Sequence, residues 1–144
     1  MSVSSLVLGV GNPDRGDDGA GIHVVRRLQG RGRALEVRDC SNLVALWADE
    51  PDVTVVDATI SGAEPGTVTR FDGLTDRLPS STFQSTHSFG LAESVELGRA
   101  LGRLPRRLTV YGIEAGSLAH GEPLSPAVQR AVETLAAKLD RGDG

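Results

Sequence analysis

Three aspartates lie in a glycine-rich segment, residues 9–21, directly after the apolar run Leu6–Leu8. A glycine-rich loop between a strand and a helix usually cradles phosphate. Here the loop carries Asp14, Asp17 and Asp18, whose carboxylates repel a phosphate and attract a cation. The segment therefore predicts a site for a metal ion or a proton rather than for a nucleotide.

Two further residues could complete such a site. Asp57 closes the apolar stretch 53–58, and His87 stands between a Ser/Thr-rich stretch and a predicted helix. Two carboxylates and one imidazole suit a borderline cation such as nickel or zinc. Three protein ligands also leave a position open for a group that another molecule presents. The simpler alternatives are a loop aspartate bound by backbone amides and a histidine that caps a helix or lies at the surface.

The remaining polar candidates have plainer interpretations. Asp17 either caps the helix that follows it or orients the loop. Glu114, which ends the apolar run 107–113, either lines the same edge or is solvated. His23 and His120 are expected to be structural or surface residues, with His120 nearer the rim. Cys40 is the only cysteine, so neither a disulfide nor a cysteine-based zinc pattern is available, and a buried structural thiol is expected.

Apolar β-branched runs alternate with helical patterns along the chain. The expected strands are 5–10, 34–39, 53–58, 67–71 and 107–113. The expected helices are 19–28, a short one after Ser41, 89–104, and one that begins after Ser125 with Pro126 at its first position. The short connection between the third and fourth strands implies antiparallel pairing, and the long loop 72–86 is of a length that is often functional.

This order predicts an α/β fold, a three-layer α/β/α sandwich around a mostly parallel, twisted five-stranded sheet with one antiparallel strand. Ligand sites in such sheets gather at the carboxyl ends of the strands. Asp18, Asp57 and Glu114 follow the first, third and fifth strands. The order therefore predicts that these carboxylates converge on one edge of the sheet.

The composition is that of a globular protein. The chain has 144 residues, 39% of them hydrophobic, and a net charge of −4. We expect one domain over 1–144, and the negative charge argues against a nucleic-acid partner. No secretion signal and no apolar run of about 20 residues is present, so no membrane span is expected. A cytoplasmic monomer is the expected form.

Several short motifs occur in order along nearly the whole chain, and together they resemble the nickel–iron hydrogenase maturation endopeptidases. They are Gly9-x-Gly11-Asn12, Gly16-Asp17-Asp18-Gly19-x-Gly21, Val56-Asp57-Ala58, His87-x-x-Gly90-Leu91 and Gly112-Ile113-Glu114. One departure is Ala115, because the family often has proline after the glutamate, and this bears on which hydrogenase class is the substrate.

The resemblance implies an endopeptidase that removes a C-terminal extension from a hydrogenase large-subunit precursor after nickel insertion. By motif, its metal-contacting and catalytic residues fall on Asp18, Asp57 and His87, with nickel supplied by the precursor rather than held as a resident cofactor. The residues expected to contact the substrate are Gly11, Asn12, Asp17 and Glu114. Either an aspartate acts as general base or the cation polarises the scissile carbonyl, and the sequence leaves both open.

The sequence also bears on three other functions. A phosphoacceptor receiver domain needs a lysine after the fifth strand, and none is present there. A dinucleotide-binding module could use Asp39 for a ribose, but position 14 is aspartate where its motif needs glycine. A module that binds a metal-loaded partner without cutting it remains compatible with the sequence, and turnover distinguishes it from an enzyme.

Overall fold

A computed structural model describes residues 5–83 and 89–142. Its one sheet has the strand order β2-β1-β3-β5-β4. The strands are β1 (Ser5–Val10), β2 (Arg33–Val37), β3 (Asp52–Thr59), β4 (Val68–Asp72) and β5 (Arg107–Glu114). All neighbours pair in parallel except β4, which pairs antiparallel to β5. The predicted fold class is therefore confirmed.

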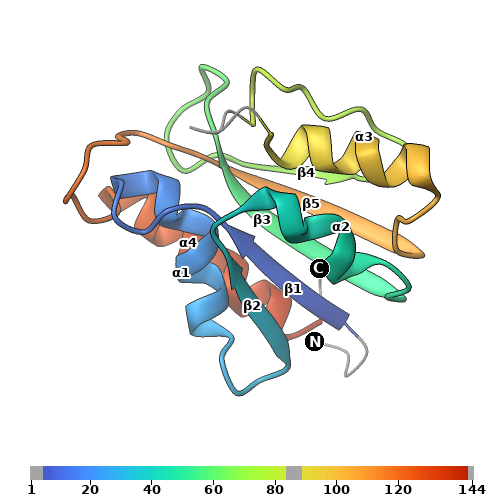
Figure 1. Cartoon of the computed structure of the whole chain (residues 1–144). Coiled ribbons are helices and arrows are strands. Elements are labelled where there is room, and N and C mark those ends of the chain that lie inside the picture. Colours follow the sequence, from blue (N-terminus) through green and yellow to red (C-terminus); the bar gives the residue numbers. More distant parts are fainter. Residues whose placement is uncertain (1–4, 84–88, 143–144) are drawn as a thin grey trace.

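Helices cover both faces of the sheet (Figure 1). One layer holds α1 (Ala20–Arg27) and α4 (Pro126–Asp140), and the other holds α2 (Leu43–Trp47) and α3 (Leu91–Leu101). Short 3-10 turns, Gly16–Gly19 and Cys40–Asn42, precede α1 and α2. Each layer seals its own apolar core against the sheet, one around Val25 and Val132 and the other around Trp47 and Phe83.

Helices α1 and α4 bury their apolar residues against the sheet. In α1 and its C-cap, Ile22, Val25 and Leu28 have almost no exposed surface. Gly21 allows this helix to approach the sheet closely, because a Cβ there would lie 2.2 Å from the Val56 carbonyl oxygen. The apolar residues of α4 that recur at helical spacing are likewise buried: Val128, Val132, Leu135 and Leu139. Packing of these faces, more than helix propensity, holds the helices in place.

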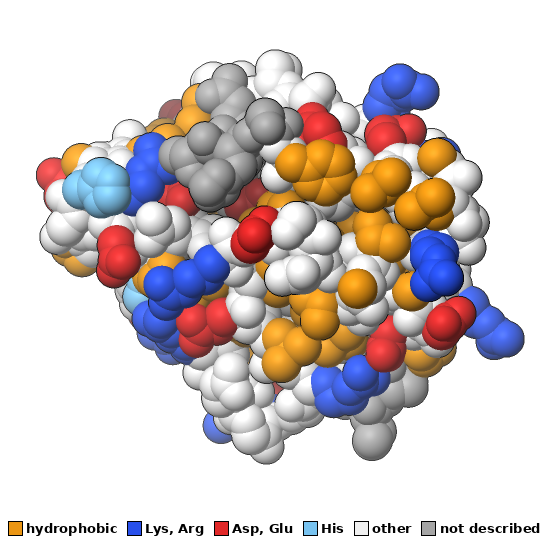
Figure 2. All heavy atoms as spheres, in the orientation of Figure 1, with side chains coloured by type: hydrophobic (Ala, Val, Ile, Leu, Met, Phe, Trp, Pro, Cys, Tyr) orange, Lys and Arg blue, Asp and Glu red, His pale blue; other side chains and the backbone are white. Residues whose placement is uncertain are grey.

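Two details differ from the sequence-based expectation. The antiparallel strand β4 pairs with β5 and not with β3, because the connection from Ile60 to Thr67 steps over the position that β5 occupies. The helix predicted over 89–104 ends earlier, at Leu101, with a left-handed cap at Gly102, and Leu101 itself is 58% exposed. Figure 2 shows the hydrophobic side chains that gather over α2 and α3, where Leu97 is also exposed.

The parallel strands bring distant residues to one edge of the sheet. Asp57 near the end of β3 pairs with Gly112 of β5, and Thr59 pairs with Glu114. The glycine-rich loop leaves β1 at this same edge. None of the helices in the described part of the chain is long and apolar enough to cross a bilayer.

Candidate functional site: two carboxylates at the carboxyl edge of the sheet

The loop after β1 is shaped to hold the Asp18 carboxylate. Gly11 has φ of 147°, and a Cβ at this position would lie 2.0 Å from the Asp18 carbonyl oxygen. The backbone therefore requires glycine at this position. The next residue, Asn12, donates its N–H to the Asp18 Oδ2 atom at 3.1 Å and to the Asp18 carbonyl oxygen at 3.3 Å. Gly11 and Asn12, both expected to contact substrate, thus position Asp18.

The Asp18 side chain is half-buried and weakly paired. Burial raises its pKa, and the nearby Arg15 and the N–H of Asn12 only partly oppose that rise. The Arg15 guanidinium lies 3.9 Å from Oδ2, at the limit of an ion pair. At pH 7 the charge on Asp18 is therefore costly and only partly compensated by its own surroundings.

Asp57 is more deeply enclosed, with 8% of its surface exposed. Its Oδ1 atom accepts the N–H of Ala58 at 2.8 Å, the one hydrogen bond that described residues give this carboxylate. Burial raises the pKa of Asp57 well above its usual range, and the neighbouring Asp18 carboxylate raises it further. The structure thus brings Asp18 and Asp57 together, as predicted from the strand ends.

The third expected metal contact, His87, lies outside the described residues. Among residues 5–83 and 89–142, no three His, Cys, Asp or Glu side chains form a group that could hold a metal ion. A buried and a half-buried carboxylate that repel each other are nevertheless a set of oxygen donors whose repulsion a cation would relieve. The two aspartates therefore suit a cation, whereas an anion would add to their repulsion.

Asp17, the neighbour of Asp18, differs from it because hydrogen bonds fully compensate its buried carboxylate. It has no exposed surface, and its carboxylate accepts the N–H groups of Gly116, Ser117 and Ser125 at 2.7–2.9 Å and the Ser125 hydroxyl at 2.8 Å. Burial alone would raise the pKa of Asp17, but these bonds outweigh burial and lower it. The alternative that Asp17 caps α1 is wrong, because its side chain ties the turn to loop 116–125. It therefore fixes the turn that carries Asp18, and its expected contact with the substrate stays a prediction.

Glu114, like Asp17, is a buried carboxylate that accepts several hydrogen bonds. It is 4% exposed and accepts hydrogen bonds from the Thr59 hydroxyl, the Ser61 hydroxyl and N–H, and the N–H of Gly62. Burial opposes ionisation, but the bonds from Ser61, Thr59 and Gly62 prevail and lower its pKa. The interpretation of Glu114 as a solvated residue is wrong. It fixes the backbone that follows β3 at Ser61 and Gly62, four and five residues beyond Asp57.

The structure gives Ser125 and Cys40 contacts that the sequence did not predict. The Ser125 hydroxyl does not cap α4, as its position suggested, but donates to Asp17. Cys40 is buried as expected, yet it lies close enough to the site for Asp57 and Asp18 to act on its thiol. Burial first, and these charges second, raise the pKa of Cys40 to about 12. A cysteine seventeen positions before Asp57 carries no sequence signal of that proximity.

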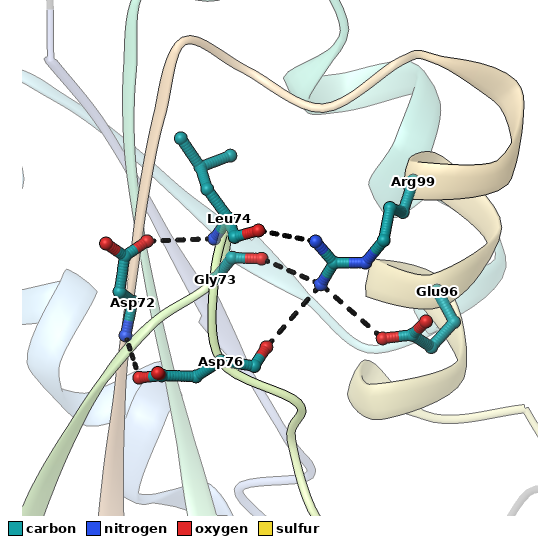
Figure 3. A network of polar contacts seen from close by, with 6 residues as sticks. All are labelled: Asp72, Gly73, Leu74, Asp76, Glu96 and Arg99. Carbon is teal, nitrogen blue, oxygen red and sulfur yellow. Dashed lines mark hydrogen bonds and ion pairs between the residues drawn. The ribbon is translucent and has the colours of Figure 1, made fainter.

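The loop that follows β4 begins at the opposite edge of the sheet, beside the start of β5, and returns to the edge that holds Asp57. Arg99 of α3 donates to the backbone carbonyls of Leu74, Gly73 and Asp76, at 2.5, 3.2 and 3.5 Å (Figure 3). At its other end, the Thr82 carbonyl accepts the N–H of Ile60, directly beyond β3, at 2.9 Å. The long loop predicted over 72–86 is thus anchored at both ends of its described part.

The two other histidines lie away from the carboxylates. Both line an open pocket of about 670 Å³ on the α1 side of the glycine-rich loop, together with Asp14, Arg26, Arg38 and Glu122. Burial, helped by Arg26 and Arg27, lowers the pKa of His23. His120 is exposed, in keeping with the expectation of a surface residue near the rim.

Comparison with known proteins identifies the family of this chain. A family model described as hydrogenase maturation protease matches residues 38–140. HupD, a hydrogenase expression/formation protein of Thiocapsa roseopersicina, is 32% identical and aligns over 91% of this chain and 67% of its own length. The hydrogenase 2 maturation protease of Escherichia coli (strain K12) is 30% identical over 89% of this chain and 83% of that protein.

A solved structure agrees as well. The NiFe hydrogenase maturation protease HybD from Thermococcus kodakarensis superposes with a TM-score of 0.76 at 27% identity, over 95% of this chain and 97% of that one. The fold is an α/β sheet protein with two neighbouring carboxylates, Asp18 and Asp57, at the carboxyl ends of its parallel strands. The chain belongs to the hydrogenase maturation protease family and is therefore a peptidase.

Proposed function

We propose that this chain removes the C-terminal extension of a nickel–iron hydrogenase large-subunit precursor after nickel has been inserted. The observation that carries the proposal is the pair Asp18 and Asp57, two neighbouring carboxylates with raised pKa values and few hydrogen bonds. The names of the similar proteins, which are maturation proteases for hydrogenases, support the same reaction.

The nickel ion enters this reaction as part of the substrate. Held by groups of the precursor, it would dock against Asp18, Asp57 and the expected third contact, His87. Docking a cation relieves the repulsion between two buried carboxylates, whereas a precursor without nickel leaves that repulsion in place. The site would therefore distinguish filled from unfilled precursor by differential affinity, which makes nickel insertion a condition for cutting.

Hydrolysis of the peptide bond needs an activated water molecule and a proton donor. An aspartate of the pair can accept the proton of the water, as carboxylates with raised pKa values do in other hydrolases. Alternatively, the substrate's cation polarises the scissile carbonyl. Both routes use Asp18 and Asp57, so the aspartic or metal-dependent character of the peptidase is decided by which one operates. A cytoplasmic monomer is the expected working form.

The test is to incubate the chain with a cognate large-subunit precursor, with and without inserted nickel, and to measure the intact mass of the precursor. Loss of a C-terminal peptide from the nickel-loaded form alone supports the proposal. Cutting of both forms removes nickel as the condition. A stable complex on a sizing column, with no change of mass, supports the binding-only alternative.

A further inference from the structure

The strand β4 lies at one edge of the sheet, and its backbone groups alternate in direction. The Thr67 carbonyl accepts the N–H of Glu114, and the N–H of Gly73 donates to the Leu108 carbonyl. These two bonds mark the ends of the antiparallel ladder with β5, so odd-numbered residues of β4 face β5. The N–H and C=O groups of Val68, Arg70 and Asp72 consequently point away from the sheet.

The far end of this edge is closed by the chain itself. The N–H of Asp72 donates to the Asp76 Oδ2 atom at 2.8 Å (Figure 3), and the N–H of Asp76 donates to the Asp72 carbonyl at 2.8 Å. The Arg99 guanidinium also stabilises this turn, because it donates hydrogen bonds to the backbone carbonyls of residues 73, 74 and 76. A further strand could not continue past Asp72. Proteins commonly block exposed strand edges in such ways.

The other end of the edge is open. Within residues 5–83 and 89–142, no hydrogen bond engages the outward N–H or C=O groups of Val68 and Arg70. Both residues are exposed, and Val68 retains 41% of its surface. Four backbone donors and acceptors are therefore available over three residues, while the next outward pair is occupied.

This open stretch is level with the candidate site. Asp57 of β3 pairs with Gly112 of β5, which pairs with Thr69 of β4, so the three residues form one row across the sheet. Strands are spaced by about 4.8 Å, which places a strand added beyond β4 about 14 Å from β3. About four or five extended residues span that distance. One polypeptide could occupy the open edge and reach the carboxylates.

We propose that the open edge of β4, residues 68–70, binds an extended segment of the polypeptide substrate as a sixth strand. The proposal rests on the proposed function, because a peptidase must hold a polypeptide, and the backbone of a polypeptide carries the partners that the free N–H and C=O groups of this edge need. Main-chain hydrogen bonds supply the affinity in this mode of recognition. The edge holds the substrate while the scissile bond lies at Asp18 and Asp57.

Charge favours a substrate segment over a second copy of this chain. Among the described residues, no acidic side chain pairs with Arg70, the last residue of the open stretch. Antiparallel self-pairing of two β4 strands over residues 68–70 would set Val68 opposite Arg70. It would make the two Arg70 side chains diagonal neighbours on one face, which like-charge repulsion disfavours. A substrate segment with an acidic residue opposite Arg70 would meet the opposite charge.

The first test measures hydrogen exchange at single amides. The wild-type chain first cuts nickel-loaded precursor, and the product mass gives the cut site. A nickel-loaded precursor with proline after that site is then bound without being cut. We expect the amides of Val68 and Arg70 to exchange at least about tenfold more slowly in this complex. The outward amides of Ala34 and Glu36 on the opposite edge strand, β2, should not change.

The second test uses proline, which deletes an N–H group and is tolerated on edge strands. Arg70→Pro removes an outward donor without touching the ladder to β5, and we expect it to raise KM about fivefold or more with kcat nearly unchanged. The matched control is Glu36→Pro, the same change at an outward position of β2, which should leave KM unchanged. Thermal unfolding verifies that both variants are folded.

The outcomes separate the two proposals. Failure of the wild-type chain to cut nickel-loaded precursor overturns the proposed function and this inference together. Cutting with unchanged exchange at Val68 and Arg70 overturns only the inference. Slower exchange that grows with the concentration of this chain alone would assign the edge to self-association and also overturn it. The exchange measurement holds even if Arg70→Pro does not fold.

Discussion

Two pairs of carboxylates lie at the same edge of the sheet and differ in how far hydrogen bonds compensate their charge. Asp17 and Glu114 each accept four hydrogen bonds, and their pKa values are lowered. Asp18 and Asp57 have few donors, repel each other and have raised pKa values. The first pair holds the loops in place. The second pair carries an uncompensated charge that an incoming cation can satisfy.

The largest effect is expected for Asp57→Asn, which removes one carboxylate of the pair Asp18 and Asp57. The amide keeps the shape but removes the charge, so we expect processing of nickel-loaded precursor to fall by about a hundredfold or more. The free energy of unfolding at pH 7 should not fall, because a costly buried charge is removed. Product mass against time measures the first effect, and urea unfolding measures the second. The control is Asp14→Asn, an exposed carboxylate of the same loop. A normal rate for Asp57→Asn would remove Asp57 from the site.

Asp17→Ala tests the other member of the comparison. Removing the acceptor leaves the N–H groups of Gly116, Ser117 and Ser125 unpaired, which should cost about 3 kcal/mol in the free energy of unfolding. The matched change Asp14→Ala removes an exposed carboxylate three residues away and should cost less than about 0.5 kcal/mol. Urea unfolding compares the two variants. Equal losses would show that the bonds to Asp17 do not hold the loop.

The two pairs should also have opposite effects on the pH dependence of stability. A lowered pKa means that the unfolded chain binds more protons, so the stability from Asp17 and Glu114 is present above about pH 4 and lost as pH falls further. A raised pKa means that the folded chain binds more protons. Stability is then lost as pH rises from about 4 through the raised pKa values of Asp18 and Asp57.

Unfolding at a series of pH values measures this difference. The stability of Asp57→Asn relative to wild type should grow as pH rises above about 4 and then level off. That of Asp17→Asn should fall relative to wild type as pH rises toward about 4. Parallel curves for both variants and the wild type would contradict the division into two pairs.

The smallest expected effect is that of Ser125→Ala. Loss of one hydroxyl donor to Asp17 should cost about 1 kcal/mol. The same substitution in an Asp17→Ala background should cost much less, because the hydroxyl acts through Asp17. A double-mutant cycle by urea unfolding measures the coupling. Equal costs in both backgrounds would indicate that Ser125 acts as a helix cap.

The fold and the positions of Asp18 and Asp57 could be predicted because short stretches of the sequence determine them. Asp57 ends an apolar β-branched run, and the glycine-rich loop follows another, so both carboxylates had to lie at strand ends. The roles of Asp17 and Glu114 could not be predicted in that way. Asp17 and Asp18 are adjacent and identical in type, and which of them turns inward is decided by loop 116–125, about a hundred positions further along.

The same limit applies to the edge of the sheet. A short connection predicted that β4 would be antiparallel, which is correct, but β5 comes later in the chain and takes the place beside β3. The neighbour of a strand depends on a long-range competition that local spacing does not reveal. The closed and open halves of the β4 edge follow from that arrangement and from Asp76.

The most direct test of the account is the affinity of this chain for precursor with and without nickel. Titration calorimetry with the uncleavable precursor measures both dissociation constants without turnover. The account predicts binding at least about tenfold tighter for the nickel-loaded form, a difference of about 1.4 kcal/mol, and loss of that difference in Asp57→Asn. Equal affinities for the two forms in the wild-type chain would contradict it, because Asp18 and Asp57 would then not be reserved for a cation.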